Sequence, residues 1–407
     1  MANSSRKAGR TLVEFYDSEY LENVVALLCG DYTAVTYVYF RHANEPDLAD
    51  RQRLLAFIQE RFGFAPRFLE IPETSMDAAL TSFRRLAAES PCDFDITGGS
   101  SLFIAAAGAL LAELGRERVW IHEYDVPAGR RKFCFPVDAH NDTQRGPNPL
   151  TVSEVMALRG VRMLNSETPI RYAMNTELRG EIIRLWEAVR SQLRAWNSFS
   201  VLPAEYTQTW SGLLVEKRMD SRQYSGMQPL LDNLSRAKIL SDRNTWVKGG
   251  QTFLSFRLNV PDAAFVLYQK GGNLLELLTC LAVEDSGRFH DCCTGVKLDW
   301  DDRGARGYVD PFNELDVVMT KGHIPYFVSC KNTAVENDYL YEIMTMTRHF
   351  GGAYAVPVLV SSAENGSALH VRAEEMGIVL LDGVGGLTAA QFTKKLHHAL
   401  CEAQSGN

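Results

Sequence analysis

The protein has 407 residues, of which 46% are hydrophobic and 23% are charged. These proportions are those of an ordinary globular protein, and they exclude an intrinsically disordered chain. The length predicts two or three domains. The formal net charge of −8 argues against a protein coated by nucleic acid over its whole surface.

The first ten residues, MANSSRKAGR, are polar and lack the apolar core of a secretory signal. The longest apolar stretch, residues 102–112, is about half the ~20 residues that a membrane-spanning helix needs. The eight cysteines form no CxxC pair, which favours reduced thiols over a disulfide framework. Cys292 and Cys293 lie close to His290, but closed zinc sites usually draw on two separated ligand pairs, so we expect no zinc there. We therefore expect a cytoplasmic protein without a membrane segment.

Residues 11–135 alternate between strand and helix patterns. Strands are predicted at 12–16, 34–40, 67–71, 92–96 and 118–124, and helices at 19–28, 47–62, 76–88 and from the turn at 97–101 to residue 114. Strands and helices that alternate at this spacing predict a parallel sheet with helices on both faces. The sequence therefore predicts an α/β fold that begins with a Rossmann-like domain over residues 1–147.

The middle of the chain, residues 148–260, has a different pattern. Helices are predicted at 151–159, 177–196 and 230–240, followed by a hairpin over 245–258 around Gly249-Gly250. Helices followed by a hairpin resemble a winged-helix module, although helical linker domains share the pattern. Residues 151–260 hold 15 Lys and Arg against 10 Asp and Glu, so this part of an acidic chain is basic. It is either a surface that faces a polyanion or a solvated helical face.

A third block, residues 261–407, returns to mixed α/β patterns. Helices are predicted at 271–283, 339–350 and 387–402, and strands at 314–319, 325–331, 355–361 and 378–381. The strands at 314–319 and 325–331 are joined by a short turn. They are therefore expected to pair as neighbours in a C-terminal α/β domain.

The run Thr97-Gly98-Gly99-Ser100-Ser101 lies between the fourth predicted strand and a helix. Glycines let backbone N–H groups approach an anion, the N-terminus of the helix attracts negative charge, and the hydroxyls add donors. The run lacks the Lys of a Walker A loop, and a tight turn capped by Ser explains it equally simply. In doubly wound sheets ligands bind at the carboxyl ends of strands, so Asp17 and Ser18, after the first strand, are expected in the same crevice.

Acids and a lysine gather in the third block. Glu314 and Asp316 are expected to share one face of a strand, and Ser329 and Lys331 one face of the next, with Glu276 on the preceding helix. Carboxylates beside a lysine are typical of a Mg²⁺ or Mn²⁺ site that hydrolyses phosphodiesters. The alternative is an ordinary ion pair.

These residues resemble the PD-(D/E)xK nuclease superfamily, which has a helix acid, a strand Asp and (D/E)xK on the next strand. Glu276, Asp316 and Lys331 fall into these positions within GGNLLE, NELDVVMTKG and YFVSCKN. The glycine turn in a Rossmann-like domain resembles the CARF domain, which binds cyclic oligoadenylates, the second messengers of type III CRISPR immunity. Over nearly its whole length the chain is similar to the CARF–nuclease effectors and their uncharacterised relatives.

The resemblance implies a homodimer in which two CARF domains enclose one cyclic oligoadenylate. Residues 97–101 would hold phosphates or riboses, with Asp17 and Ser18 at the rim. It also implies cleavage of DNA and/or RNA with Mg²⁺ or Mn²⁺. Glu276, Asp316 and Glu314 would be metal ligands, and Lys331 would act with them in catalysis.

The sequence departs from the superfamily at Ser329, where an acid is expected two residues before the lysine. A neutral hydroxyl is a poor ligand for a hard cation, so Glu314 or Glu276 would supply the missing charge, with Glu342 a weaker candidate. The departure, with the basic middle block, supports an alternative: a ligand-responsive, nucleic-acid-binding regulator with a degenerate nuclease site. A small-molecule Rossmann enzyme is disfavoured, because no acid is placed for ribose recognition after a first-strand glycine loop.

Overall fold

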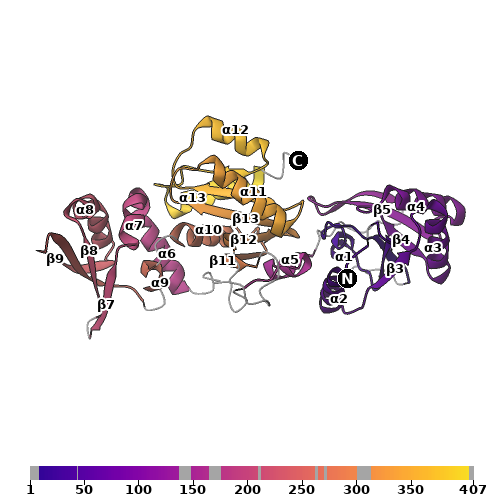
Figure 1. The fold of residues 1–407 in the computed structure, drawn as a ribbon, viewed down its shortest axis with the longest axis horizontal. Coiled ribbons are helices and arrows are strands. Elements are labelled where there is room, and N and C mark those ends of the chain that lie inside the picture. Colours follow the sequence, from indigo (N-terminus) through magenta and orange to yellow (C-terminus); the bar gives the residue numbers. More distant parts are fainter. Residues whose placement is uncertain are drawn as a thin grey trace, which may run out of the picture.

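The computed structural model of the protein describes residues 9–43, 45–136, 148–164, 176–209, 212–261, 265–269, 273–299 and 313–402. The molecule is elongated, with an N-terminal α/β unit at one end and, at the other, a small unit that contains a four-stranded sheet (Figure 1). A C-terminal α/β unit lies between them. Within the described ranges, no helix has the length and apolar character needed to cross a membrane.

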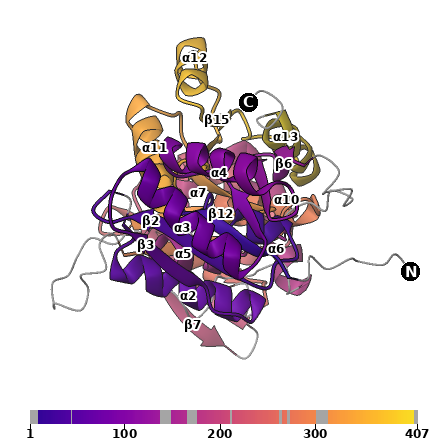
Figure 2. The same ribbon diagram turned by 90° about the vertical axis from the view of Figure 1, so that its right-hand side faces the viewer.

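The N-terminal unit, which lies in front in Figure 2, is built on a six-stranded sheet of order β3-β2-β1-β4-β5-β6. Neighbouring strands are parallel from β3 to β5, and β6 is antiparallel to β5. Its elements are β1 Thr11–Phe15, α1 Val25–Cys29, β2 Val35–Phe40, α2 Leu48–Phe62, β3 Arg67–Ile71, α3 Met76–Glu89, β4 Cys92–Asp95, α4 Ser101–Leu114, β5 Val119–Asp125 and β6 Arg130–Phe135. The predicted Rossmann-like sheet is confirmed, and β6 is an addition to it.

Both faces of this sheet are covered by helices. On one face Phe83 of α3 and Phe103 of α4 pack against Phe15, and on the other Leu54 and Ile58 of α2 belong to a second core. The central strands are buried on both sides: every residue of β2 and β4 is buried, and so is every residue of β1 after the first. Such strands read as continuous apolar and β-branched runs, which is why the sequence predicts them well.

In its described residues, the middle of the chain has helices before, between and after the strands of an antiparallel sheet of order β7-β8-β10-β9. The elements are α5 Val152–Arg159, α6 Thr176–Val189, the 3₁₀ turn η3 Arg190–Gln192, α7 Leu193–Ser200, β7 Ala204–Thr209, β8 Gly212–Met219, α8 Ser221–Arg236, β9 Leu240–Lys248, β10 Gln251–Leu258 and α9 Phe265–Gln269. The predicted hairpin is confirmed as β9–β10. Strands β7 and β8 are not predicted from the sequence, because most of β7 is exposed and carries no apolar alternation.

The C-terminal unit has a five-stranded sheet of order β11-β12-β13-β14-β15. Strands β11 to β13 are antiparallel, and β13 to β15 are parallel. The elements are α10 Leu274–Asp285, β11 Asp291–Leu298, β12 Asn313–Lys321, β13 Ile324–Lys331, α11 Asn337–Gly351, β14 Val356–Ser361, α12 Ser367–Glu375, β15 Val379–Leu381 and α13 Ala389–Glu402. The predicted pairing of the two strands around residue 320 is confirmed, whereas β11 and α12 are not predicted.

The core of the C-terminal unit places α10 on one face of the sheet. Leu277 and Leu281 of α10 belong to the same cluster as Val317 of β12 and Val328 of β13. On the other face α11 contributes Ile343, and residues of α5 complete that layer. Because α10 packs across β12 and β13, its first turn lies near the ends of these strands.

Candidate functional site

Asp316 lies where β12 and β13 stop pairing. Its Oδ2 atom accepts a hydrogen bond of 2.6 Å from the Cys330 N–H and one of 3.2 Å from the Ser329 hydroxyl. Burial raises the pKa of Asp316, while the Cys330 amide, the Lys331 charge and the Ser329 hydroxyl lower it. Ser329, which stands where the nuclease pattern has an acid, therefore orients Asp316 in this chain.

Glu276 lies in the first turn of α10 and is half-buried. Burial raises the pKa of its carboxyl to about 8, helped by the charges of Asp316 and Glu314 and opposed by that of Lys331. Four side chains from one helix and two strands thus influence one another, as the sequence predicts. Two partly buried carboxylates of like charge are unfavourable without a cation between them.

Lys331 is the last residue of β13. Its Nζ atom lies 4.7 Å from the centroid of the Tyr339 ring on α11, a cation–π contact that holds the ammonium group. The charge of Lys331 favours the ionised forms of both Glu276 and Asp316. The structure thereby brings together the three residues on which the predicted site depends.

Glu314 is more peripheral than the alternating pattern predicts. Its side chain is 49% exposed, and its Oε2 atom lies 3.9 Å from Lys297 Nζ on β11. Leu315 and Val317, which a regular strand places on one face, pack in different core clusters. Opposite this point Gly295 of β11 has a φ of 57°. The alternation is interrupted at Asp316, a local irregularity of the kind that re-aims side chains in sheets.

The fit of a divalent cation rests on two carboxylates. Among residues 9–402 with their undescribed gaps left aside, no group of three or more His, Cys, Asp and Glu side chains is arranged around a common metal position. Mg²⁺ commonly keeps several waters and binds through one or two carboxylates and the phosphates of its substrate. Without a cation, burial raises the pKa of both Glu276 and Asp316 and so favours their neutral forms. A bound divalent ion would favour the ionised forms instead. Glu342, on α11, is exposed.

The pKa of Glu276 predicts a pH-dependent stability difference. A carboxyl whose pKa rises from 4.5 to about 8 on folding makes the folded state lose stability as pH rises through this window. At pH 8 the Glu276→Gln variant is therefore expected to have a higher melting temperature than wild type. The difference should be roughly 2–4 °C for each kcal/mol by which the substitution raises the free energy of unfolding. The gain should shrink to nothing near pH 4.5. Melting curves of both proteins across this range without metal check it, and a constant difference would contradict the assignment.

The residues predicted to form the ligand crevice lie at the carboxyl ends of β1 and β4, which are neighbours in the sheet. Asp17 follows β1, and its Oδ2 atom accepts a hydrogen bond of 3.1 Å from the Gly99 N–H. Ser18 is exposed next to it, with its hydroxyl 3.4 Å from Asp17 Oδ1. This position is the switch point of strand order, where open α/β sheets bind ligands.

Within the turn, the residues serve different purposes. The Thr97 hydroxyl donates to Asp95 at 2.5 Å and accepts from the Tyr124 N–H at 2.8 Å, so it is engaged internally. Ser100 caps α4 by accepting from the Leu102 N–H at 3.2 Å. Ser101 is exposed. The prediction that a Ser caps the helix is therefore confirmed for Ser100. The part of the turn suited to an anion is the backbone of Gly98 and Gly99.

Two acids that are not predicted from the sequence follow β1: Glu22 lies against the glycine turn, and Glu19 points to the Ala353 amide. An ideal Cβ on Gly98 would lie 2.6 Å from Glu22 Oε2, so the glycine allows the carboxylate to approach the turn. Burial raises the pKa of Glu22 to about 6, with Asp17, Glu19 and Asp95 adding to it and a hydrogen bond from Tyr354 opposing it. The sequence contains no signal for these acids beyond their place after a strand.

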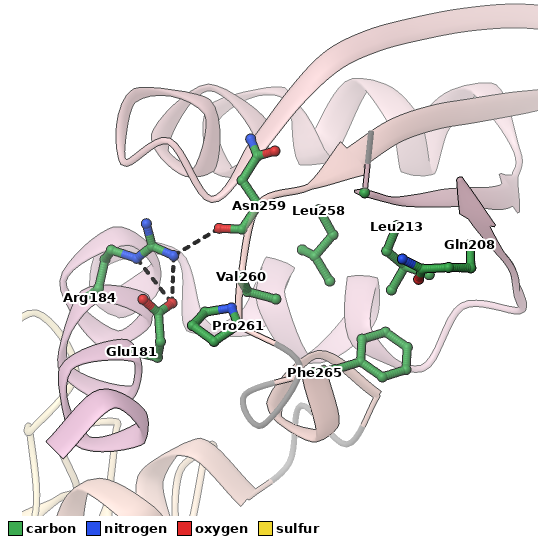
Figure 3. Close-up of a pocket in the computed structure, with 10 residues that line it drawn as sticks. Glu181, Arg184, Gln208, Leu213, Leu258, Asn259, Val260, Pro261 and Phe265 are labelled. Carbon is green, nitrogen blue, oxygen red and sulfur yellow. Dashed lines mark hydrogen bonds and ion pairs between the residues drawn. The ribbon is translucent and has the colours of Figure 1, made fainter. Parts of the chain in front are cut away.

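A separate pocket of about 690 Å³ lies in the middle of the chain, between α6, the start of β8 and the segment that follows β10 (Figure 3). Arg184 donates to Glu181 at 2.5 Å and to the Asn259 carbonyl at 3.0 Å along one wall, and Leu258 and Phe265 form the apolar side. None of the residues predicted for either site lines it.

Comparisons with known proteins find likeness in structure alone. No family model matches the sequence, and no curated protein matches it. The crystal structure of protein VC1899 from Vibrio cholerae has 18% identity and a TM-score of 0.72 over 98% of this chain and 99% of that one. Can2 from Sulfobacillus thermosulfidooxidans, solved with cyclic tetra-adenylate, has 17% identity and a TM-score of 0.60 over 97% of both chains.

A third solved structure is described as a type III CRISPR defence DNA nuclease activated by cyclic oligoadenylate. It has 15% identity and a TM-score of 0.53, and covers 96% of this chain but 51% of that one. This chain therefore spans about half the length of that nuclease. At these identities the likenesses establish a shared fold. The chain shares this fold with the solved structures, in agreement with the mixed α/β fold predicted from the sequence.

Proposed function

We propose that the protein is a nuclease that uses Mg²⁺ or Mn²⁺ and is activated by a cyclic oligoadenylate in antiviral defence. The observation that carries the proposal is the group formed by Glu276 in the first turn of α10, Asp316 where β12 stops pairing with β13, and Lys331 at the end of β13. Support comes from the shared fold with Can2, which binds cyclic tetra-adenylate, and with a nuclease that cleaves DNA. The substrate is DNA and/or RNA.

Each residue has a separate task in this proposal. The Cys330 amide and Ser329 hydroxyl hold Asp316 in one orientation, and Glu276 adds a second carboxylate from the helix. A bound Mg²⁺ or Mn²⁺ supplies Lewis acidity at the phosphoryl oxygen and lowers the pKa of the attacking water. Lys331, held by Tyr339, stabilises the negative charge that develops on the phosphate.

The activator is proposed to bind the crevice formed by the turn of residues 97–101 with Asp17 and Ser18. A cyclic oligoadenylate has rotational symmetry, which suits a site shared across the two-fold axis of a homodimer. Backbone N–H groups at the start of α4 are suited to its phosphates. The dimer is part of the proposal, and sedimentation measures it directly.

Binding and cleavage are tested together on the purified full chain. Cyclic tri-, tetra- and hexa-adenylate are screened by thermal shift, since a ligand that binds only the folded state raises the melting temperature. At 100 times its Kd such a ligand adds about 2.7 kcal/mol to the free energy of unfolding. Plasmid and labelled single strands are then incubated with Mn²⁺. We expect one ring size to raise the melting temperature and stimulate cleavage. A flat thermal response to all three rings would refute the activator.

A second candidate is a ligand-responsive, nucleic-acid-binding regulator. It is favoured by Ser329, whose hydroxyl stands in place of an acid, and by the basic residues 151–260. This candidate predicts a salt-sensitive mobility shift of nucleic acid without cleavage. Cleavage in the presence of Mn²⁺ decides against it.

A further inference from the structure

One short segment touches both the ligand crevice and the C-terminal unit. Residues 17–24 follow β1 and precede α1. On the crevice side Asp17 accepts from the Gly99 N–H at 3.1 Å, and Glu22 Oε2 lies against Gly98. The segment is internally fixed, because the Asn23 side chain accepts from the Asp17 N–H at 2.9 Å and donates to the Asp17 carbonyl at 2.7 Å.

The same segment contacts the turn between α11 and β14. The Tyr354 hydroxyl donates to Glu22 Oε1 at 2.6 Å, and the Ala353 N–H donates to Glu19 Oε2 at 2.7 Å. The Tyr20 hydroxyl donates to the Gly351 carbonyl at 3.2 Å. The two oxygens of Glu22 therefore lie toward different units, one at the glycine turn and the other at Tyr354.

The end of α11, from which this turn starts, is packed closely against β13, the strand that carries Ser329 and Lys331. An ideal Cβ on Gly351, the last residue of α11, would lie 2.5 Å from the Phe327 ring, so α11 and β13 touch here without spare room. Phe327 is fully buried, and β13 continues to Ser329 and Lys331. Close-packed interiors transmit displacement because they have little free volume to absorb it.

We propose that Glu22 and Tyr354 transmit occupancy of the glycine turn to the nuclease site, an inference that rests on the proposed function. In this structure the Asp17 carboxylate accepts a hydrogen bond from the Gly99 N–H. A phosphate that binds the turn competes for this amide and brings negative charge toward Glu22. Residues 17–24 then move, and Tyr354 moves with Glu22. The ligand thus has different contacts in the two states, as any population shift requires.

The test removes one hydroxyl. Tyr354→Phe deletes the donor to Glu22 and keeps the ring. Tyr341→Phe is the matched control, because Tyr341 lies on α11, is 49% exposed and bonds only to Arg372 among the hydrogen bonds of the described residues. For each protein we measure the Kd of cyclic tetra-adenylate by calorimetry and the ratio of Mn²⁺-dependent cleavage rates with and without it.

Tyr354→Phe is expected to bind the ligand within about threefold of wild type, whereas its stimulation ratio falls by about tenfold, the factor that corresponds to 1.4 kcal/mol. Tyr341→Phe should match wild type in both measurements. Equal stimulation of Tyr354→Phe and wild type overturns the coupling and leaves the proposed function intact. If wild type itself neither binds nor responds, it is the proposed function that fails.

Discussion

Asp316→Asn is expected to lower Mn²⁺-dependent cleavage by about 100- to 1,000-fold, the usual cost of removing one group that stabilises charge in a transition state. The substitution keeps the shape of the side chain and an oxygen that accepts from the Cys330 N–H, but removes the negative charge. Burial already raises the pKa of Asp316, so losing its charge should leave the fold at least as stable. An inactive protein with an unchanged or higher melting temperature is the expected result.

The control for this variant is Asp338→Asn, because Asp338 is an exposed acid in the first turn of α11. It should cleave as wild type does. A second readout does not depend on turnover: Mn²⁺ should raise the melting temperature of wild type and of Asp338→Asn, but raise that of Asp316→Asn much less. Cleavage by Asp316→Asn at the wild-type rate would remove this residue from the site.

Most elements of the two α/β units follow from the sequence because the predicted strands are largely buried, whereas β6, β11 and α12 are not predicted. β2, β13 and the second half of β12 are runs of mostly apolar and β-branched residues, and in the apolar part of α10 Glu276 is the one acid before Glu284. Asp316 and Lys331 are brought together by two strands that are adjacent in the sequence, since β12 and β13 form a hairpin with a short turn. Asp316 and Lys331 were therefore within reach of sequence reasoning.

Other features depend on contacts between distant residues. A helix is predicted from residue 19, but α1 begins at Val25, because the Asn23 side chain bonds to the backbone of Asp17 and competes with helical hydrogen bonding. That irregular segment positions Glu19 and Glu22 between two units. The role of Ser329 is likewise invisible in the sequence, where it counts as a missing acid, whereas its hydroxyl binds Asp316.

The glycine turn yields the second large effect, through Gly99→Ala. Gly99 has a φ of 85°, and an added Cβ would lie 2.4 Å from the Cβ of Phe15, a buried residue of β1. The left-handed conformation costs an L-residue about 1–2 kcal/mol, and crowding in a packed core adds about 1–3 kcal/mol. We expect the melting temperature to fall by roughly 5–10 °C.

The fall in stability has to be separated from the loss of ligand binding. Gly108→Ala in the neighbouring α4 is the control, because Gly108 has no atom within 4 Å of an added Cβ, and alanine stabilises a helix by about 0.5–1 kcal/mol. Both variants should be folded at the temperature where the ligand is added. Cyclic tetra-adenylate should then raise the melting temperature of Gly108→Ala and leave that of Gly99→Ala unchanged. A normal ligand response in Gly99→Ala would show that the activator does not use this turn, because an added methyl group that crowds Phe15 should displace the Gly99 amide.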